Sequence, residues 1–206
     1  LPEKKKSQVR QDLHLPRSAT LITLPGRLSP GKGHKVWIDA LAQINDTPST
    51  ASWHGLIVGE TRGPDGKDSE YSHDLKEYIG QKGLAEKITF TGYRSDLSDI
   101  LQCSDIVVVP SIREAFGLTV IEAMAARKPV VGSDSGSIPE IIDSKSGMLF
   151  QPDNSSALAS SIRLLLEDAE LRSSIGQAAR RRVEDNFSLD VHVRRLTDEY
   201  NSILEI

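Results

Sequence analysis

The chain has 206 residues, enough for one large domain or for a domain with an added helical tail. Its formal net charge of −4 provides no basic excess, which argues against a nucleic-acid-binding protein. Cys103 is the single cysteine, so the sequence excludes a disulfide framework, and its place beside a predicted strand indicates a buried small side chain. Because the sequence shows neither a signal-peptide pattern nor an apolar run of membrane-spanning length, we expect a cytoplasmic protein.

The predicted elements begin with a short polar helix over residues 5–15, which Pro16 ends. The opening LPEKKK is neither an initiator nor a targeting sequence, and we expect the natural protein to be longer at its N-terminus. A strand follows over residues 19–24, and a glycine-rich loop then leads into a helix over residues 34–44. Apolar residues at helical spacing, beginning with Trp37, indicate one buried face of that helix.

The loop of residues 26–35, GRLSPGKGHK, nearly matches a Walker A phosphate loop. Its glycines and Lys32 fit G-x-x-x-x-G-K, but Gly33 stands where that motif has the Ser or Thr that binds magnesium. We interpret the loop as a turn that presents Arg27 and Lys32 at a helix N-terminus, where charge-assisted hydrogen bonds neutralise a diphosphate without a metal ion. The alternative is that both cations are ordinary surface charges.

Strands and helices continue to alternate beyond this loop. Short β-branched runs closed by Gly, Pro or Ser are typical of strands buried on both faces. The predicted strands span residues 53–59, 87–91, 105–110, 129–133 and 147–150. The predicted helices span residues 70–82, 118–126, 137–142, 157–167, 169–182 and 189–204, with a further short helix that Ser95 caps and a flexible surface loop over 60–69. The pattern predicts a Rossmann-like, doubly wound α/β fold with about six mostly parallel strands and helices on both faces.

The stretch of residues 110–136 concentrates the polar groups of the predicted fold. Glu114 precedes a helix start at the carboxyl end of a strand, which is where such sheets carry their chemistry, so we expect it in the crevice. The free N–H groups of Leu118 and Thr119 suit an anion, and Glu122, one turn into the helix, would accept hydrogen bonds from ligand hydroxyls. These groups together suggest that the ligand is a nucleotide sugar, which carries both hydroxyls and phosphate. The alternative is that both glutamates are solvent-facing helix charges.

The loops after the first, third, fourth and fifth predicted strands should line one crevice, because parallel strands end at the same edge of a sheet. They carry Arg27 and Lys32, then Tyr93 and Arg94, then residues 114–119, and finally residues 134–136. Complementary groups on four loops are better evidence for a ligand crevice than any one motif.

The run EAFGLTVIEAMA, from Glu114 to Ala125, resembles the E-x7-E signature of the retaining family 4 glycosyltransferases. The loop GRL…KG of residues 26–33 resembles a second motif of that family. Further matches extend the resemblance from about residue 19 to residue 200. It implies one half of a GT-B fold: residues 1–18 form a linker with a short helix, residues 19–186 a nucleotide-sugar-binding domain, and residues 187–206 a helix that crosses back to a missing N-terminal acceptor domain.

The resemblance also implies a metal-independent, retaining hexosyltransferase without a cofactor, whose donor is a UDP-, GDP- or ADP-sugar and whose acceptor is an unidentified glycan or lipid-linked molecule. Arg27 and Lys32 would stabilise the departing diphosphate and Glu114 would contact the sugar hydroxyls, which makes these the implied catalytic residues. We expect the chain alone to be inactive. The implied donor-binding residues are Gly26, Arg27, Lys32, Tyr93, Arg94, Glu114, Phe116, Gly117, Leu118, Thr119 and Glu122.

Two alternative functions remain open. A nucleotide-sugar epimerase or a phosphorylase could share the overall fold, but an epimerase should depart from the E-x7-E run, and a phosphorylase should show a lysine for a pyridoxal cofactor. A P-loop nucleotide-binding module belongs to another class, and Gly33 argues against it. The arginine-rich last helices make peripheral association with acidic membrane lipid a candidate, although intervening acidic residues favour a solvated face.

Overall fold

The computed structural model describes residues 6–47, 51–60 and 69–204. Within these residues six strands form a single sheet in the order β3-β2-β1-β4-β5-β6, and every neighbouring pair is parallel. The strand order reverses between β1 and β4, which makes their carboxyl ends the topological switch point of the sheet. The strands are β1 (Thr20–Pro25), β2 (Trp53–Val58), β3 (Ile88–Phe90), β4 (Ile106–Val109), β5 (Val130–Ser133) and β6 (Met148–Phe150). The prediction of a doubly wound, six-stranded sheet is confirmed.

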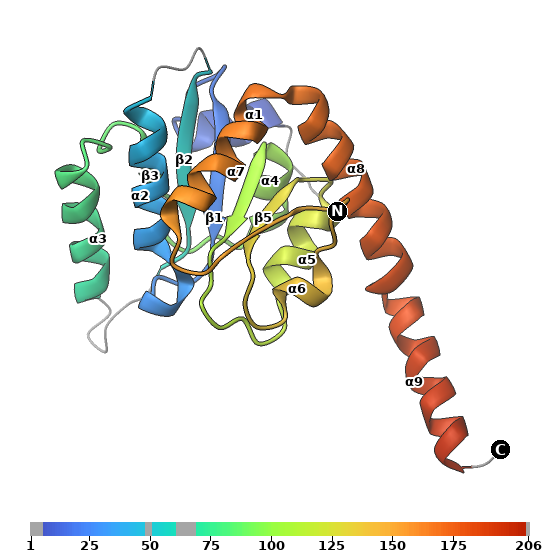
Figure 1. Ribbon diagram of the computed structural model, residues 1–206. Helices are drawn as coiled ribbons and strands as arrows, with labels where there is room; N and C mark the ends of the chain where they lie inside the picture. Colours follow the sequence, from blue (N-terminus) through green and yellow to red (C-terminus); the bar gives the residue numbers. More distant parts are fainter. Residues whose placement is uncertain (1–5, 48–50, 61–68, 205–206) are drawn as a thin grey trace.

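Helices cover both faces of this sheet (Figure 1). One face packs against α2, α3 and α7, and the other against α1, α4, α5, α6 and α8. The helices are α1 (Lys6–Asp12), α2 (His34–Asn45), α3 (Glu70–Gln81), α4 (Leu97–Cys103), α5 (Leu118–Ala125), α6 (Ile138–Ile141), α7 (Ser155–Glu167), α8 (Ala169–Asn186) and α9 (Leu189–Leu204), with one turn of 3-10 helix over Pro30–Lys32.

The core follows directly from the β-branched strand sequences. All four residues of β4 and all six of β2 are buried, as expected for strands covered on both faces. In β1, Ile22 and Leu24 pack into the cluster beneath α2, whereas Leu21 joins the cluster beneath α1 and α4. This alternation is the two-residue period of a strand, and it directs the side chains of β1 into the hydrophobic clusters on both faces of the sheet.

The last helix, α9, extends away from the body of the domain (Figure 1). The exposed apolar residues Leu189, Val193, Leu196 and Tyr200 recur along it at helical spacing. The helix therefore presents an apolar stripe that the described residues of this chain leave uncovered.

Two predictions about loops have different outcomes. The prediction that Ser95 caps α4 is wrong, because the cap is Asp96, whose carbonyl accepts the N–H of Asp99. Arg94 holds both carboxylate oxygens of Asp96, so the Asp96 side chain does not cap the helix. The predicted flexible loop over 60–69 falls mostly on residues 61–68, which lie outside the described residues.

A buried ionic network attaches α1 to the amino edge of the sheet. Arg10, whose side chain is 10% exposed, donates to Asp105 and to the carbonyls of Pro16 and Ala19. Asp105 also accepts the N–H of Leu21 at 2.9 Å. The carboxylate thus joins α1, the start of β1 and the start of β4.

Replacing Asp105 by Ala should lower the free energy of unfolding by about 2–3 kcal/mol, because it leaves the buried Arg10 without its carboxylate and the Leu21 N–H without an acceptor. Urea unfolding followed by circular dichroism measures this change. Lys6 also pairs with Asp105, but its side chain is 48% exposed, so Lys6→Ala should cost less than about 1 kcal/mol. Equal losses in the two variants would contradict the assignment of Asp105 as the anchor.

Candidate functional site

The loops that follow β1 and β4 meet at the switch point of the sheet. The N–H of Ile112 donates to the carbonyl of Gly31 at 3.0 Å, which ties the two loops together. Gly33 adopts a left-handed φ of +72°, and a Cβ there would lie 2.1 Å from the carbonyl oxygen of Pro110. Glycine is therefore required at this position, and the Ser or Thr of a Walker A loop would not fit.

Lys32 and Glu114 form an ion pair across these two loops. Their nitrogen and oxygen lie 2.7 Å apart, and their side chains are 30% and 16% exposed. Burial alone would raise the pKa of Glu114, but the Lys32 ammonium, the Ser111 hydroxyl and the Gly117 N–H outweigh it and hold that pKa below its ordinary value. Glu114 is therefore a carboxylate at neutral pH, as an acceptor of hydroxyl hydrogen bonds must be.

A hollow of about 480 Å³ lies over this ion pair. Three cations line it, Arg27, Lys32 and Arg113, together with the carboxylate of Glu114. The excess of positive charge suits a diphosphate, since Arg and Lys donors form strong hydrogen bonds with phosphate oxygens. The remaining lining residues are Ser29, Gly31, Ile112 and Ala115. Sequence reasoning missed Arg113, although its place directly before Glu114 is the signal that would have found it.

Three serines, at the end of β5 and in the loop that follows it, hold the backbone around Glu114. The hydroxyls of Ser133 and Ser135 donate to the carbonyls of Ser111 and Ile112, and the N–H of Ser137 donates to the carbonyl of Glu114 at 3.0 Å. Of the predicted crevice residues 134–136, Ser135 thus supports the backbone, whereas Gly136 lines a hollow beside Glu114. Ser133 and Ser137, two residues to either side of Ser135, add further support. These serines were not recognised in the sequence, because hydroxyl donors carry no signal without knowledge of the carbonyls that they meet.

Gly136 completes this support. Its φ is +59°, and a Cβ there would lie 2.3 Å from the carbonyl oxygen of Glu114. The close approach lets the loop after β5 pack directly against the backbone of Glu114.

The start of α5 forms the far wall of the site. Gly117 caps the helix in a left-handed conformation, and the first-turn N–H groups of Leu118 and Thr119 have no acceptor within the helix. The side chains of Phe116 and Leu118 are 62% and 61% exposed. A second hollow of about 390 Å³ lies on the Phe116 side of Glu114 and extends towards Phe187. Glu114 therefore lies between two hollows.

The other predicted donor-binding residues lie outside this cluster. Gly26 directly follows β1, next to Arg27, and Tyr93, which lies after β3, is 71% exposed. Arg94 is held by Asp96 at 2.7 Å. Glu122 lines a different hollow, of about 300 Å³, between α4 and α5. Its residue surface is exposed overall, but partial desolvation of the carboxyl within that hollow raises its pKa. The structure thus brings Arg27, Lys32 and Glu114 together and leaves Tyr93, Arg94 and Glu122 around the periphery.

Two negative findings apply to the residues that the structure describes. Over that part of the chain, no three His, Cys, Asp or Glu side chains are grouped so that they could bind a metal ion. None of the helices described is both long and apolar enough to cross a membrane.

The pH dependence of stability tests the Lys32–Glu114 pair. Glu114→Gln should lower the free energy of unfolding by about 1 kcal/mol at neutral pH, because it removes the charge of one partner in a partly buried pair. The folded-state pKa of Glu114 is depressed, so its contribution is present above the ordinary value of 4.5 and disappears as the pH falls through the folded pKa. Urea unfolding at a series of pH values should show the difference from wild type shrinking below a pH of about 5.

The exposed Glu86 offers a matched control, and Glu86→Gln should leave stability nearly unchanged at every pH. A loss in Glu114→Gln that stays constant down to a pH of about 3 would show that the ion pair is not its cause.

The sequence and the fold both match known proteins. The sequence profile described as Glycosyl transferases group 1 matches residues 5–182. The mannosyltransferase LpsB of lipopolysaccharide core biosynthesis, from Rhizobium meliloti, is 25% identical over 202 residues, which cover 97% of this chain and 56% of LpsB. Across the relatives that it matches, the chain spans about half of their length.

Two solved structures share the fold. Anabaena HepE in complex with UDP superposes with a TM-score of 0.85 at 28% identity, over 96% of this chain and 52% of HepE. The C-terminal domain of a glycosyl transferase group 1 family protein, LpcC from Francisella tularensis, superposes with a TM-score of 0.78 at 30% identity, over 91% of this chain and 95% of that domain. With a profile match that covers most of its length and a sheet of this topology, the chain belongs to the glycosyl transferases group 1 family.

Proposed function

We propose that this chain is the donor-binding half of a retaining, metal-independent hexosyltransferase of family 4. The observation that carries the proposal is the hollow at the switch point, which Arg27, Lys32 and Arg113 line together with Glu114. A nucleoside diphosphate sugar carries both a diphosphate and hydroxyls, so it matches cations and a carboxylate placed side by side. The UDP complex of HepE, a protein of the same fold, supports this class of ligand.

Transfer of the sugar breaks the bond between its anomeric carbon and the diphosphate. Negative charge then gathers on the departing phosphate oxygens, and Arg27 and Lys32 line the hollow where those oxygens would lie. Cationic donors beside those oxygens stabilise this charge more in the transition state than in the bound substrate, which is what accelerates a reaction. The backbone hydrogen bond between Ile112 and Gly31 positions the loop that carries Lys32 before the substrate binds.

Glu114 has two roles in this proposal. It orients the Lys32 ammonium through the ion pair, and its ionised carboxylate accepts hydrogen bonds from hydroxyls of the donor sugar. The N–H groups of Leu118 and Thr119 add to the diphosphate site from the start of α5, with Phe116 and Gly117 beside them. Since Glu114 is already engaged by Lys32, we assign it to positioning the donor and not to attack on the sugar.

The nucleoside end of the donor would extend from the diphosphate towards β3 and α4. Glu122 lies on the side of α5 that faces α4, where a carboxylate can accept hydrogen bonds from ribose hydroxyls. The exposed Tyr93 and its neighbour Arg94 lie beyond β3 and would flank the base, with Gly26 on the side of β1. In this proposal the three parts of the donor lie along one edge of the sheet.

The acceptor would be bound by an N-terminal domain that packs over the carboxyl edge of the sheet. The exposed apolar stripe of α9 supports this, since such a stripe suits a partner surface. The matched relatives have about twice the length of the chain, which leaves room for that domain. The arginines of α8 favour a solvated face over a lipid surface, because Arg180 pairs with Glu184 and Arg182 with Asp143.

Isothermal titration calorimetry with UDP, GDP and ADP, each with and without EDTA, tests the donor site. One diphosphate should bind in the presence of EDTA and so identify the base. Lys32→Ala should weaken that binding about tenfold or more, because it removes a charge-assisted contact with phosphate. Lys35→Ala is the matched control, since Lys35 is an exposed lysine in the first turn of α2 that packs over the ring of Tyr78.

Equal affinity of the two variants would contradict the assignment of Lys32. Binding that disappears with EDTA would contradict a metal-independent site and would favour a P-loop type of nucleotide binding.

A separate prediction concerns Arg113. Because Arg113 is exposed and lines the same hollow, Arg113→Ala should weaken diphosphate binding about threefold to tenfold without changing stability. Arg127 is an exposed arginine outside this hollow, and Arg127→Gly provides the control, since its φ of +59° suits glycine. Unchanged affinity in Arg113→Ala would mean that Arg113 does not contact the diphosphate.

A further inference from the structure

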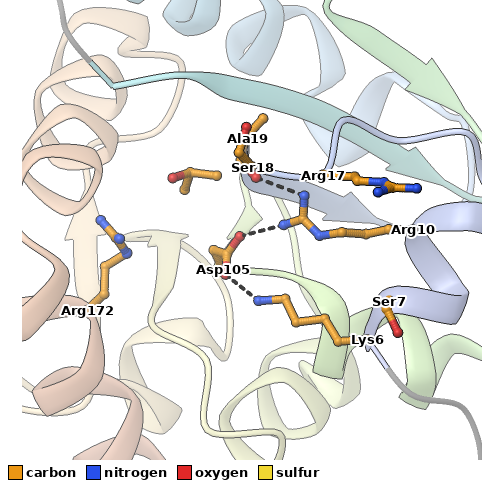
Figure 2. Close-up of a pocket in the computed structure, with 9 residues that line it drawn as sticks. Lys6, Ser7, Arg10, Arg17, Ser18, Ala19, Asp105 and Arg172 are labelled. Carbon is orange, nitrogen blue, oxygen red and sulfur yellow. Dashed lines mark hydrogen bonds and ion pairs between the residues drawn. The ribbon is translucent and has the colours of Figure 1, made fainter.

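A second charged hollow lies at the opposite, amino edge of the sheet (Figure 2). It has a volume of about 490 Å³ and is formed by α1, the segment leading into β1, the start of β4 and the start of α8. Since strands rise about 3.3 Å per residue, the length of β1 separates it from the donor site by roughly 20 Å. The lining residues are Lys6, Ser7, Arg10, Arg17, Ser18, Ala19, Thr20, Asp105 and Arg172.

The charges of this hollow are unbalanced. Four cations line it, but Asp105 is the one carboxylate among its lining residues. That carboxylate is already engaged, by Lys6 at 2.7 Å, by Arg10 at 3.1 Å and by the N–H of Leu21. Figure 2 shows Lys6 and Arg10 directed at Asp105 from one side, while Arg172 lies on the other. The hollow therefore has a surplus of positive charge.

Two of its arginines have donors that the fold does not use. Arg172 donates through Nη1 to the carbonyls of Leu165 and Leu166, and its other nitrogens form no further hydrogen bond in the described part of the chain. Arg17 is exposed and makes neither an ion pair nor a hydrogen bond with any residue described. Pairing with Asp105 accounts for the presence of Arg10 and Lys6 at this hollow. It accounts neither for Arg17 nor for the Arg172 nitrogens that form no hydrogen bond with the described residues.

A half-buried lysine, Lys128, lies nearby. It donates to the carbonyl of Gln102 at 2.7 Å, and its pKa is lowered to about 8, chiefly by burial and to a lesser extent by the charge of Lys6, with Asp105 opposing. A further cation behind the hollow adds to the positive potential that an incoming anion would meet.

We propose that this hollow is a second ligand site, which binds a small phosphorylated molecule independently of the donor crevice. Arginine forks and a lysine ammonium supply charge-assisted hydrogen bonds to phosphate oxygens, and the hydroxyls of Ser7 and Ser18 add neutral donors. The buried Arg10 gives the site a fixed wall, because three acceptors hold its guanidinium. The hollow is larger than a phosphate group, so it leaves room for the organic part of a phosphate monoester.

Titration of the ¹⁵N-labelled chain with inorganic phosphate and with glycerol 3-phosphate, at constant ionic strength, tests the proposal. The backbone amides of Ser18, Ala19 and Leu21 should shift and saturate, and they should do so equally in the Lys32→Ala variant, which weakens the donor crevice. Arg17→Gln should weaken the binding at least about fivefold. Arg181→Gln, at an exposed arginine of α8 outside the hollow, should leave it unchanged.

Lys6→Gln provides a second variant on the rim, and it should also weaken the binding, because the Lys6 side chain is half exposed and accessible to an anion. Shifts that do not saturate, or that Arg17→Gln and Arg181→Gln reduce equally, would overturn the proposal. The last titration uses vesicles of anionic phospholipid in place of the soluble phosphates. If they affect these amides while both soluble phosphates do not, the hollow is a membrane-binding surface and the proposal is wrong.

Discussion

The ion pair between Lys32 and Glu114 is the interaction on which the candidate site depends, because it joins two loops that lie 82 residues apart in the chain. Only the parallel pairing of β1 with β4 brings these loops together, since both strands end at the same edge of the sheet. The tight fit of Gly33 against Pro110 and the bond between Ile112 and Gly31 then set the distance between them. The sheet topology thus determines the charge geometry of the site.

The partial exposure of this pair matters for its function. A fully buried ion pair would be costly to open, because each charge would lose its partner in a medium of low polarity. Here the Lys32 side chain is 30% exposed, so its ammonium can reach a ligand while Glu114 still accepts one of its three donors. Glu114 is the less exposed partner, at 16%, and the serines of the loop after β5 hold its backbone. The fixed partner is therefore the carboxylate, and the adaptable partner is the cation.

The sequence predicted the sheet because short β-branched runs such as residues 106–109 are unambiguous, and it predicted the two main loops because their glycines and charges are local. It did not predict the support of Glu114, since Ser133 and Ser135 act through carbonyls about 23 residues away. The Ser95 prediction failed because α4 begins one residue later, with Asp96 at the cap position, and Arg94 engages the Asp96 carboxylate that could otherwise have capped the helix.

The two edges of the sheet create positive potential in different ways. At the carboxyl edge the N-termini of α2 and α5 add to the field of Arg27, Lys32 and Arg113, so part of it is built into the backbone. At the amino edge the carbonyls of Leu165 and Leu166, at the end of α7, oppose an anion, and Arg172 covers them. Helix N-termini add to the field there as well, because α1 and α8 both begin beside the hollow. Four cations line that hollow, although one would be enough to balance Asp105, so side chains supply the larger part of its positive potential.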